Sequence, residues 1–149
     1  MKVSIHHVDD LLGTQACALG LAQELRGDEI LFLQGPLGAG KTTFVRALVL
    51  ALGGDPERVS SPTYALVHHY QSRLPIVHVD AYRLKHGETF ADLGLDEMNG
   101  IVCIEWPDRL GGTDALRAWT VSIQPSGVSG RIIRIDSPGS IADRKRPVS

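Results

Sequence analysis

Cysteine is scarce in this chain, with two residues among 149. That number is too small for the disulfide framework that stabilises many small secreted domains. Cys17 and Cys103 each lie within an apolar run, so we expect both to be reduced side chains of the core. Cys and His spacing typical of a zinc site is missing as well.

An excess of charge of either sign is also missing. Fifteen Lys and Arg residues against seventeen Asp and Glu residues give a formal net charge of -2. No global positive field exists to hold nucleic acid, so we expect no DNA binding and only local or indirect contact with RNA. The sequence also lacks a signal-peptide pattern and an apolar run of about 18 residues or more. We therefore expect a cytoplasmic protein without a membrane span.

What remains is the composition of an ordinary globular domain, 43% hydrophobic and 21% charged. A chain of this length buries roughly 68–70% of the surface that it exposes when unfolded. The sequence shows no internal repeat and no linker. We predict a single domain over residues 1–141 and a disordered tail over residues 142–149, which lack an apolar period.

Apolar periodicity predicts the order of the first elements. A helical stripe over residues 11–25, with Asp9 or Asp10 as N-cap, predicts a helix before the first strand. The apolar run at 29–34 is typical of a strand covered on both faces. A glycine-rich loop follows, and then a helix through Leu52 that Gly53 ends.

The second half of the chain is rich in strand signals. Residues 64–70 and 76–80 are separated by the five residues QSRLP and predict a hairpin, so we expect the middle of the sheet to be antiparallel in part. Residues 81–99 carry turn and short-helix signals. Further strands are predicted at residues 101–105, 118–124 and 131–136, of which the last two alternate as half-exposed antiparallel strands do.

The residues from Gly35 to Thr42 match the phosphate-binding loop G-x-x-x-x-G-K-S/T. Glycines let backbone N–H groups approach phosphate oxygens, and the following helix directs its positive end at the same point. Lys41 adds a positive charge near the β- and γ-phosphates, and the Thr42 hydroxyl is a ligand for Mg²⁺. Chance gives this pattern on the order of once in 10⁴ to 10⁵ windows. A tight strand-to-helix turn is the alternative interpretation.

Two predicted strands end in a carboxylate, Asp80 and Glu105. Ligands collect at the carboxyl ends of strands in open α/β sheets, and Mg²⁺ takes one or two carboxylates besides phosphate and water. Either residue could instead be a solvated strand end. The sequence leaves open which one contacts the metal and which one orients the attacking water.

Other polar residues have weaker interpretations. Ser60 to Thr63 follow the loop helix, where phosphate-loop proteins often place a segment that senses the γ-phosphate, although a plain turn fits equally well. Trp106 directly follows Glu105, and such aromatics more often pack than contact a ligand. We expect His68, His69 and His78, on predicted strands, to be packed or surface side chains.

Taken together, these segments resemble the TsaE family, the small bacterial ATPases of tRNA threonylcarbamoyladenosine synthesis. The resemblance rests on five segments in the order of the family: LGAGKTTFVRALVLALG from Leu37, SPTYALVHHY from Ser61, HVDAYRL from His78, LGLDE from Leu93 and IEWPDRL from Ile104. The chain departs from the usual pattern at Pro36, where the family generally has Asp, and at Ala81, where a larger apolar residue is common.

The resemblance implies an α/β fold, P-loop NTPase-like, with three layers and a mixed, mostly parallel central sheet. It also implies ATP and Mg²⁺ as cofactors, slow hydrolysis by the isolated protein, and docking onto TsaB and TsaD, which ATP turnover resets between cycles; tRNA is touched only through that complex. Catalytic residues are then Lys41, Asp80 and Glu105, and metal ligands Thr42, Asp80 and Glu105. Nucleotide contacts are Gly35, Leu37, Gly38, Ala39, Gly40, Lys41, Thr42, Thr43, Thr63 and Arg131.

A small-molecule kinase would use the same loop, and it is the alternative function. Such kinases generally need an acceptor pocket and a lid that carries arginines. Arg109, Arg117, Arg131 and Arg134 are instead spread over predicted turns and strands. A GTPase would need an N-K-x-D run, which the sequence lacks.

Overall fold

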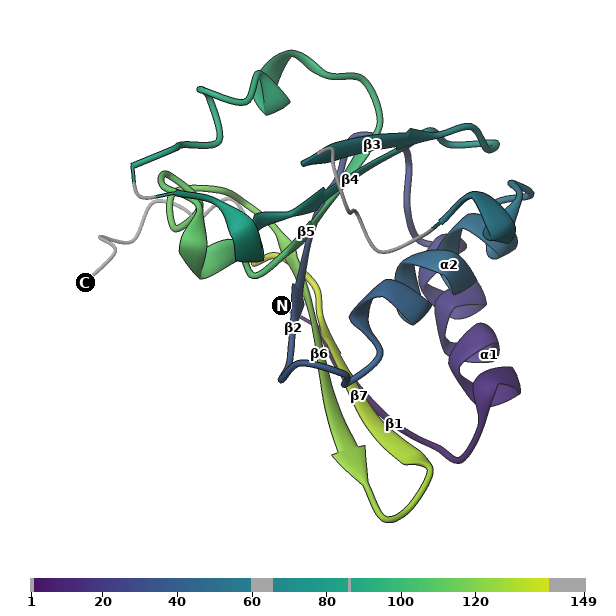
Figure 1. Ribbon diagram of the computed structural model, residues 1–149. Coiled ribbons are helices and arrows are strands. Elements are labelled where there is room, and N and C mark those ends of the chain that lie inside the picture. Colours follow the sequence, from purple (N-terminus) through teal and green to yellow (C-terminus); the bar gives the residue numbers. More distant parts are fainter. Residues whose placement is uncertain (1, 60–65, 86, 140–149) are drawn as a thin grey trace.

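A β-sheet runs through the centre of the molecule, as the computed structural model shows (Figure 1). The structure describes residues 2–59, 66–85 and 87–139. Within them the sheet has seven strands in the order β1-β7-β6-β2-β5-β4-β3. The bounds are β1 Val3–Val8, α1 Leu11–Ala22, β2 Ile30–Gln34, α2 Lys41–Ala51, β3 Val67–Tyr70, β4 Ile76–Asp80, β5 Ile101–Glu105, β6 Trp119–Ser126 and β7 Gly130–Asp136.

The predicted α/β class with a mixed sheet is confirmed. Strands β6, β2, β5 and β4 are parallel neighbours. Strand β1 pairs antiparallel with β7, β7 with β6, and β3 with β4. Parallel pairing is therefore confined to the four central strands rather than predominating. The expectation that the middle of the sheet is antiparallel in part is wrong, because the hairpin of β3 and β4 lies at an edge of the sheet. Short connections join β3 to β4 and β6 to β7, which only an antiparallel pair permits.

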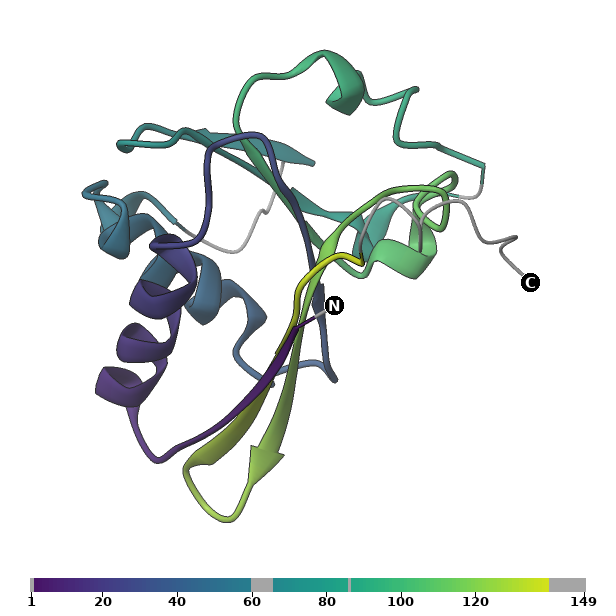
Figure 2. The same ribbon diagram turned by 180° about the vertical axis from the view of Figure 1, so that it is seen from behind.

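The two α-helices lie on one face of the sheet (Figures 1 and 2). Their buried side chains, such as Leu21 and Phe44, share one apolar cluster with that face. A second cluster on β4 and β5 packs against Phe90, Leu95 and Leu110. The third layer expected of the fold is thus built from loop and from short 3₁₀ turns: η2 Ala81–Arg83, η3 Leu95–Glu97 and η4 Pro107–Arg109.

Helix α1 begins where the sequence predicts. The carboxylate of Asp10 accepts a hydrogen bond from the Gly13 N–H at 2.9 Å, as an N-cap does. The helix ends at Ala22, three residues before the predicted end. Cys17 in this helix and Cys103 in β5 are buried free thiols, as expected. Burial raises the pKa of Cys17 to about 11 and, with a smaller effect of Glu105, that of Cys103 to about 12.

The prediction that a helix comes first is wrong, because strand β1 precedes α1. Residues Val3–Val8 pair along their whole length with β7 as an edge strand. Val3 and Ile5 are exposed on the outer face of that strand, so the residues show no simple apolar-in pattern. Pairing with a strand more than a hundred residues away forms this element, and no local signal contains that information.

Some predictions lie outside the described residues. These include the tail at 142–149, the segment 60–63 with Thr63, and the first two residues of the strand predicted at 64–70. Within the ranges that the structure does describe, no helix combines the length and apolar character needed to span a bilayer.

Candidate functional site

The loop between β2 and α2 has a backbone that only glycine permits at two points. Gly35 has φ +148°, and a Cβ atom there would lie 2.3 Å from the carbonyl oxygen of Ile123. Gly40 is the N-cap of α2 with φ +107° and provides no side-chain cap. The N–H groups of the first turn of α2 have no intrahelical acceptor, so they are available to an anion.

Lys41 is the first residue of α2 and is held inside the site. Its Nζ donates a hydrogen bond to the carbonyl oxygen of Gly35 at 2.6 Å and lies 3.6 Å from the ring centroid of Trp106. Only 5% of the residue is exposed. Burial lowers the pKa of Lys41, while the carboxylates of Glu105, Asp80 and Asp108 oppose this effect. An anion bound beside Lys41 would favour the charged form of its ammonium group.

Thr42 and Glu105 meet across the site. The Thr42 hydroxyl donates to the carboxylate, with Oγ1 3.0 Å from Oε2 and 3.3 Å from Oε1. Asp80 is the register partner of Glu105 on the neighbouring strand. Its Oδ1 accepts a hydrogen bond from the Tyr82 N–H at 3.0 Å. The structure therefore brings both predicted acids to one edge, with Glu105 in direct contact with Thr42.

These side chains line one open cavity of about 420 Å³. It contains most of the predicted loop positions and two residues that were not predicted, Tyr82 and Arg83. Exposed Leu37, at 68%, forms part of its rim. The lining residues are Leu37, Gly38, Gly40, Lys41, Thr42, Thr43, Asp80, Tyr82, Arg83, Glu105, Trp106 and Arg131.

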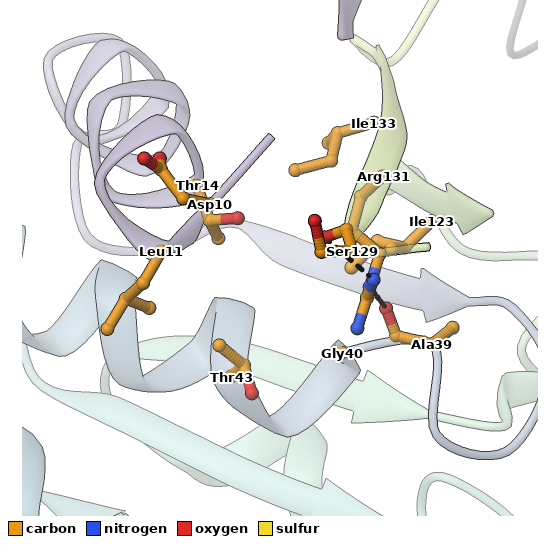
Figure 3. Close-up of a pocket in the computed structure, with 10 residues that line it drawn as sticks. All are labelled: Asp10, Leu11, Thr14, Ala39, Gly40, Thr43, Ile123, Ser129, Arg131 and Ile133. Carbon is orange, nitrogen blue, oxygen red and sulfur yellow. Dashed lines mark hydrogen bonds between the residues drawn. The ribbon is translucent and has the colours of Figure 1, made fainter. Parts of the chain in front are cut away.

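Arg131 of β7 fixes the loop from the other side. Its Nε donates to the carbonyl oxygen of Ala39 at 2.7 Å, and its Nη1 donates to that of Gly130 at 2.9 Å. Arg131 lines both the 420 Å³ cavity and a second pocket of about 190 Å³. Figure 3 shows this pocket between the start of α1, with Asp10 and Thr14, and the loop side of α2.

Trp106 adopts a left-handed backbone conformation with φ +60°, which is uncommon for an aromatic residue. Its ring lies 5.1 Å from that of Tyr82, and the Arg109 guanidinium stacks over Tyr82 at 4.5 Å. Packing of the Trp106 ring was expected, but no aromatic neighbour was predicted for it. The contact with the ammonium group of Lys41 was not predicted either.

Sequence reasoning missed the partner of Glu105 inside the sheet. His78 is fully buried, and its Nε2 lies 2.6 Å from Glu105 Oε2. His78 was expected to be a packed or surface side chain. It is packed, and it also belongs to the site. A histidine in the middle of the apolar strand IVHVD was the available signal, because a buried polar group needs a partner.

The fold and the site together define an α/β protein with a mixed sheet, in which a strand, a glycine-rich loop and a helix border a polar cavity. The family model described as "Threonylcarbamoyl adenosine biosynthesis protein TsaE" matches residues 8–133. The chain therefore belongs to the TsaE family, which functions in tRNA threonylcarbamoyladenosine biosynthesis.

Individual relatives agree with this assignment. The chain is 41% identical over 102 residues to "tRNA threonylcarbamoyladenosine biosynthesis protein TsaE" of Treponema pallidum (strain Nichols), covering 66% of this chain and 73% of that protein. It is 41% identical over 98 residues to the protein of the same name in Aquifex aeolicus (strain VF5), covering 64% and 71%. A solved structure, "Crystal structure of Bacillus subtilus YdiB", superposes with a TM-score of 0.70 at 26% identity, covering 93% of this chain and 87% of that one.

Proposed function

We propose that this protein binds ATP together with Mg²⁺ at the loop and hydrolyses it. The observation that carries the proposal is the pairing of Thr42 with Glu105 directly beside the uncapped start of α2. A hydroxyl and a carboxylate next to unpaired N–H groups and a buried ammonium group make a site for a metal bound to phosphate.

The phosphate end of the nucleotide belongs to the loop. The positive φ angles of Gly38 and Gly40 shape the backbone around the space in front of α2. Lys41, already beside Gly35, supplies the full positive charge. Because the ammonium group is buried, its attraction to a phosphate is less screened than at the surface.

The donor set fits Mg²⁺. No group of three or more Cys, His, Asp or Glu residues converges anywhere in the described part of the chain. The site instead offers Thr42 and Glu105, with Asp80 beside them, and Mg²⁺ typically uses one or two protein oxygens plus phosphate and water. Glu105 is the direct ligand in this proposal, because it alone of the two acids touches Thr42.

The nucleoside end fits the second pocket. That pocket shares Gly40, Thr43 and Arg131 with the phosphate cavity, and the apolar side chains of Leu11 and Ile133 also line it. Asp10 and Thr14 add polar groups that can pair with a base or a ribose. A ligand that crosses from one pocket to the other passes Arg131.

Hydrolysis then needs one contribution from the metal and three from the chain. Mg²⁺, when bound, withdraws charge from the phosphate oxygens. Lys41 and the loop N–H groups stabilise the negative charge that develops on the transferred group. Asp80 has one oxygen fixed by Tyr82, and its second oxygen orients the attacking water. The Trp106 ring covers Lys41 and limits access of bulk water.

The biological setting of this activity follows from the family. We propose that the protein acts in the cytoplasm on a TsaB–TsaD complex, resets it between cycles by turning over ATP, and meets tRNA only through that complex. Family membership in tRNA threonylcarbamoyladenosine biosynthesis supports the setting. Arg109 contacts Tyr82 and Trp106 and does not line the cavity. Its position therefore does not support a kinase lid.

Calorimetry with ATP in magnesium and in EDTA tests the proposal. Heat of binding that increases with Mg²⁺ supports it, and no heat from folded protein contradicts it. Lys41→Ala should abolish productive binding, whereas Lys85→Ala, at an exposed lysine, should not. Turnover stimulated by TsaB and TsaD identifies the reset role, and turnover stimulated by a small metabolite instead identifies a kinase.

A further inference from the structure

The middle of strand β4 holds a histidine with no access to solvent. His78 is 0% exposed, between the buried residues Val77 and Val79. Its register partners are Cys103 on β5 and His68 on β3. A polar ring is costly in such a place unless both of its nitrogens are paired.

Both nitrogens are paired, and the partners lie on the two neighbouring strands. Nε2 contacts Glu105 Oε2 at 2.6 Å, and Nδ1 contacts the Tyr70 hydroxyl at 3.1 Å. Glu105 in turn accepts the Thr42 hydroxyl. Tyr70, His78, Glu105 and Thr42 thus form a continuous chain of hydrogen bonds from β3 through β4 and β5 to the first turn of α2.

The direction of these hydrogen bonds follows from chemistry. A carboxylate can only accept, so the 2.6 Å contact with Glu105 places a hydrogen on His78 Nε2; in a ring that carries one hydrogen, Nδ1 then accepts from the Tyr70 hydroxyl. Burial raises the pKa of Tyr70 to about 12, which keeps that proton in place at neutral pH. Tyr70 thus donates to His78, and His78 donates to Glu105.

The two oxygens of Glu105 are therefore in different situations. Oε2 accepts from His78 at 2.6 Å and lies 3.0 Å from Thr42 Oγ1, whereas Oε1 has only the longer 3.3 Å contact with Thr42. A carboxylate held by one oxygen presents the other in a defined direction. Partners of this kind orient metal ligands in proteins and typically change metal affinity 10- to 100-fold when they are removed.

We propose that His78 is a positioning residue that orients the Glu105 carboxylate toward the metal bound with the nucleotide, with Tyr70 fixing the histidine ring. The inference rests on the proposed function and adds a role to a residue outside the cavity. His78 itself lies behind Glu105 and is not among the residues that line the cavity.

Two substitutions of His78 separate its contacts. Asn places an amide near the position of Nδ1 and retains a partner for Tyr70, but it does not reach Glu105. Gln places its amide nitrogen near the position of Nε2 and retains the donor to Glu105. Tyr70→Phe removes the hydroxyl that fixes the ring. His69→Asn is the matched control, because His69 is an exposed histidine on the neighbouring strand.

The readout is ATP affinity measured by calorimetry over a series of Mg²⁺ concentrations and in EDTA. We expect His78→Asn to raise the Mg²⁺ midpoint about 10-fold or more and to leave the affinity in EDTA unchanged. His78→Gln should restore most of the difference, Tyr70→Phe should give a smaller shift in the same direction, and His69→Asn should give none. A purely structural role would lower the melting temperature without moving the Mg²⁺ midpoint.

The outcomes keep the two proposals apart. Wild-type protein that binds ATP without any dependence on Mg²⁺, or not at all, overturns the metal site and this inference with it. If ATP binding by the wild type depends on Mg²⁺ and His78→Asn has the same Mg²⁺ midpoint as the wild type, the positioning role alone is overturned. If His78→Asn does not fold, Tyr70→Phe decides, since an unchanged midpoint in that variant contradicts the ordered chain of hydrogen bonds.

Discussion

The Thr42 hydroxyl lies within 3.3 Å of both carboxylate oxygens of Glu105, although the two residues are 63 positions apart in the chain. Strand β5 ends at Glu105, and α2 begins one residue before Thr42. Because β5 is the parallel neighbour of β2, its carboxyl end lies beside the loop that follows β2. Sheet register therefore assembles the acid and hydroxyl pair.

The two acids should be separable by substitution. Glu105→Gln removes the charge next to Thr42, so the gain in ATP affinity on adding Mg²⁺ should fall about 10-fold or more. Asp80→Asn should keep that gain and lower turnover about 100-fold, as loss of a base or water-orienting group does. Calorimetry and a phosphate-release assay measure the two effects. The assignment fails if the Asn variant loses the Mg²⁺ gain and the Gln variant keeps it.

Gly35 should be the least replaceable glycine of the loop. A Cβ atom at Gly35 would meet the Ile123 carbonyl oxygen at 2.3 Å, so Gly35→Ala should lower the free energy of unfolding by about 2–3 kcal/mol. Gly38 has φ +76° with open space around it, and Gly38→Ala should cost only about 1 kcal/mol of backbone strain.

The matched control lies in helix α1. A Cβ atom at Gly20 would meet nothing within 4 Å, and the residue lacks a positive φ, so Gly20→Ala should raise stability by about 0.5–1 kcal/mol. Urea unfolding of the three variants gives the ranking. Equal effects at Gly35 and Gly38 would show that the contact with Ile123 does not limit the loop.

Arg131 should matter for nucleotide affinity through the loop backbone. Arg131→Ala removes the donor to the Ala39 carbonyl oxygen and a positive charge between the two pockets, so ATP affinity should fall about 10-fold, as expected for loss of a charge-assisted contact. Arg134→Ala is the control on the same strand, because Arg134 pairs with Asp136 near the surface. Similar losses of affinity in both variants would point to net charge rather than to the loop contact.

Stability should decline in mild alkali. The pKa of Cys17 is raised from 9.0 to about 11, so the folded state keeps its thiol protonated while the unfolded chain ionises above pH 9. The contribution of the Cys17 thiol to the free energy of unfolding is fully present below pH 9 and falls by about 2 kcal/mol by pH 11. Denaturant unfolding in reducing buffer at several pH values measures the slope. Cys17→Ala should be less sensitive to pH over this range, and an unchanged slope would reject the cause given.

Local patterns predicted the elements that carry the site. The apolar run before Gly35 and the helical stretch after Gly40 reappear as β2 and α2, and the two strand-final acids reappear at the ends of β4 and β5. Each of these signals lies within a few neighbouring residues, which is why the sequence contains them.

Other features depend on distant partners and were not predictable. Strand β1 forms on β7, and the second face of the sheet is covered by 3₁₀ turns instead of helices. His78 could be recognised as a buried polar residue, but its contact with Glu105 required the register of β4 against β5. Arg131 reaches Ala39 from 92 positions away.

The sequence by itself determined the glycine-rich loop between β2 and α2, its lysine and its threonine, because eight consecutive residues specify their own backbone and chemistry. Only the tertiary structure decided that Glu105 meets Thr42, that His78 holds Glu105, and that Arg131 supports the loop. Those contacts depend on strand order and register, which arise from burying two apolar faces of one sheet at once.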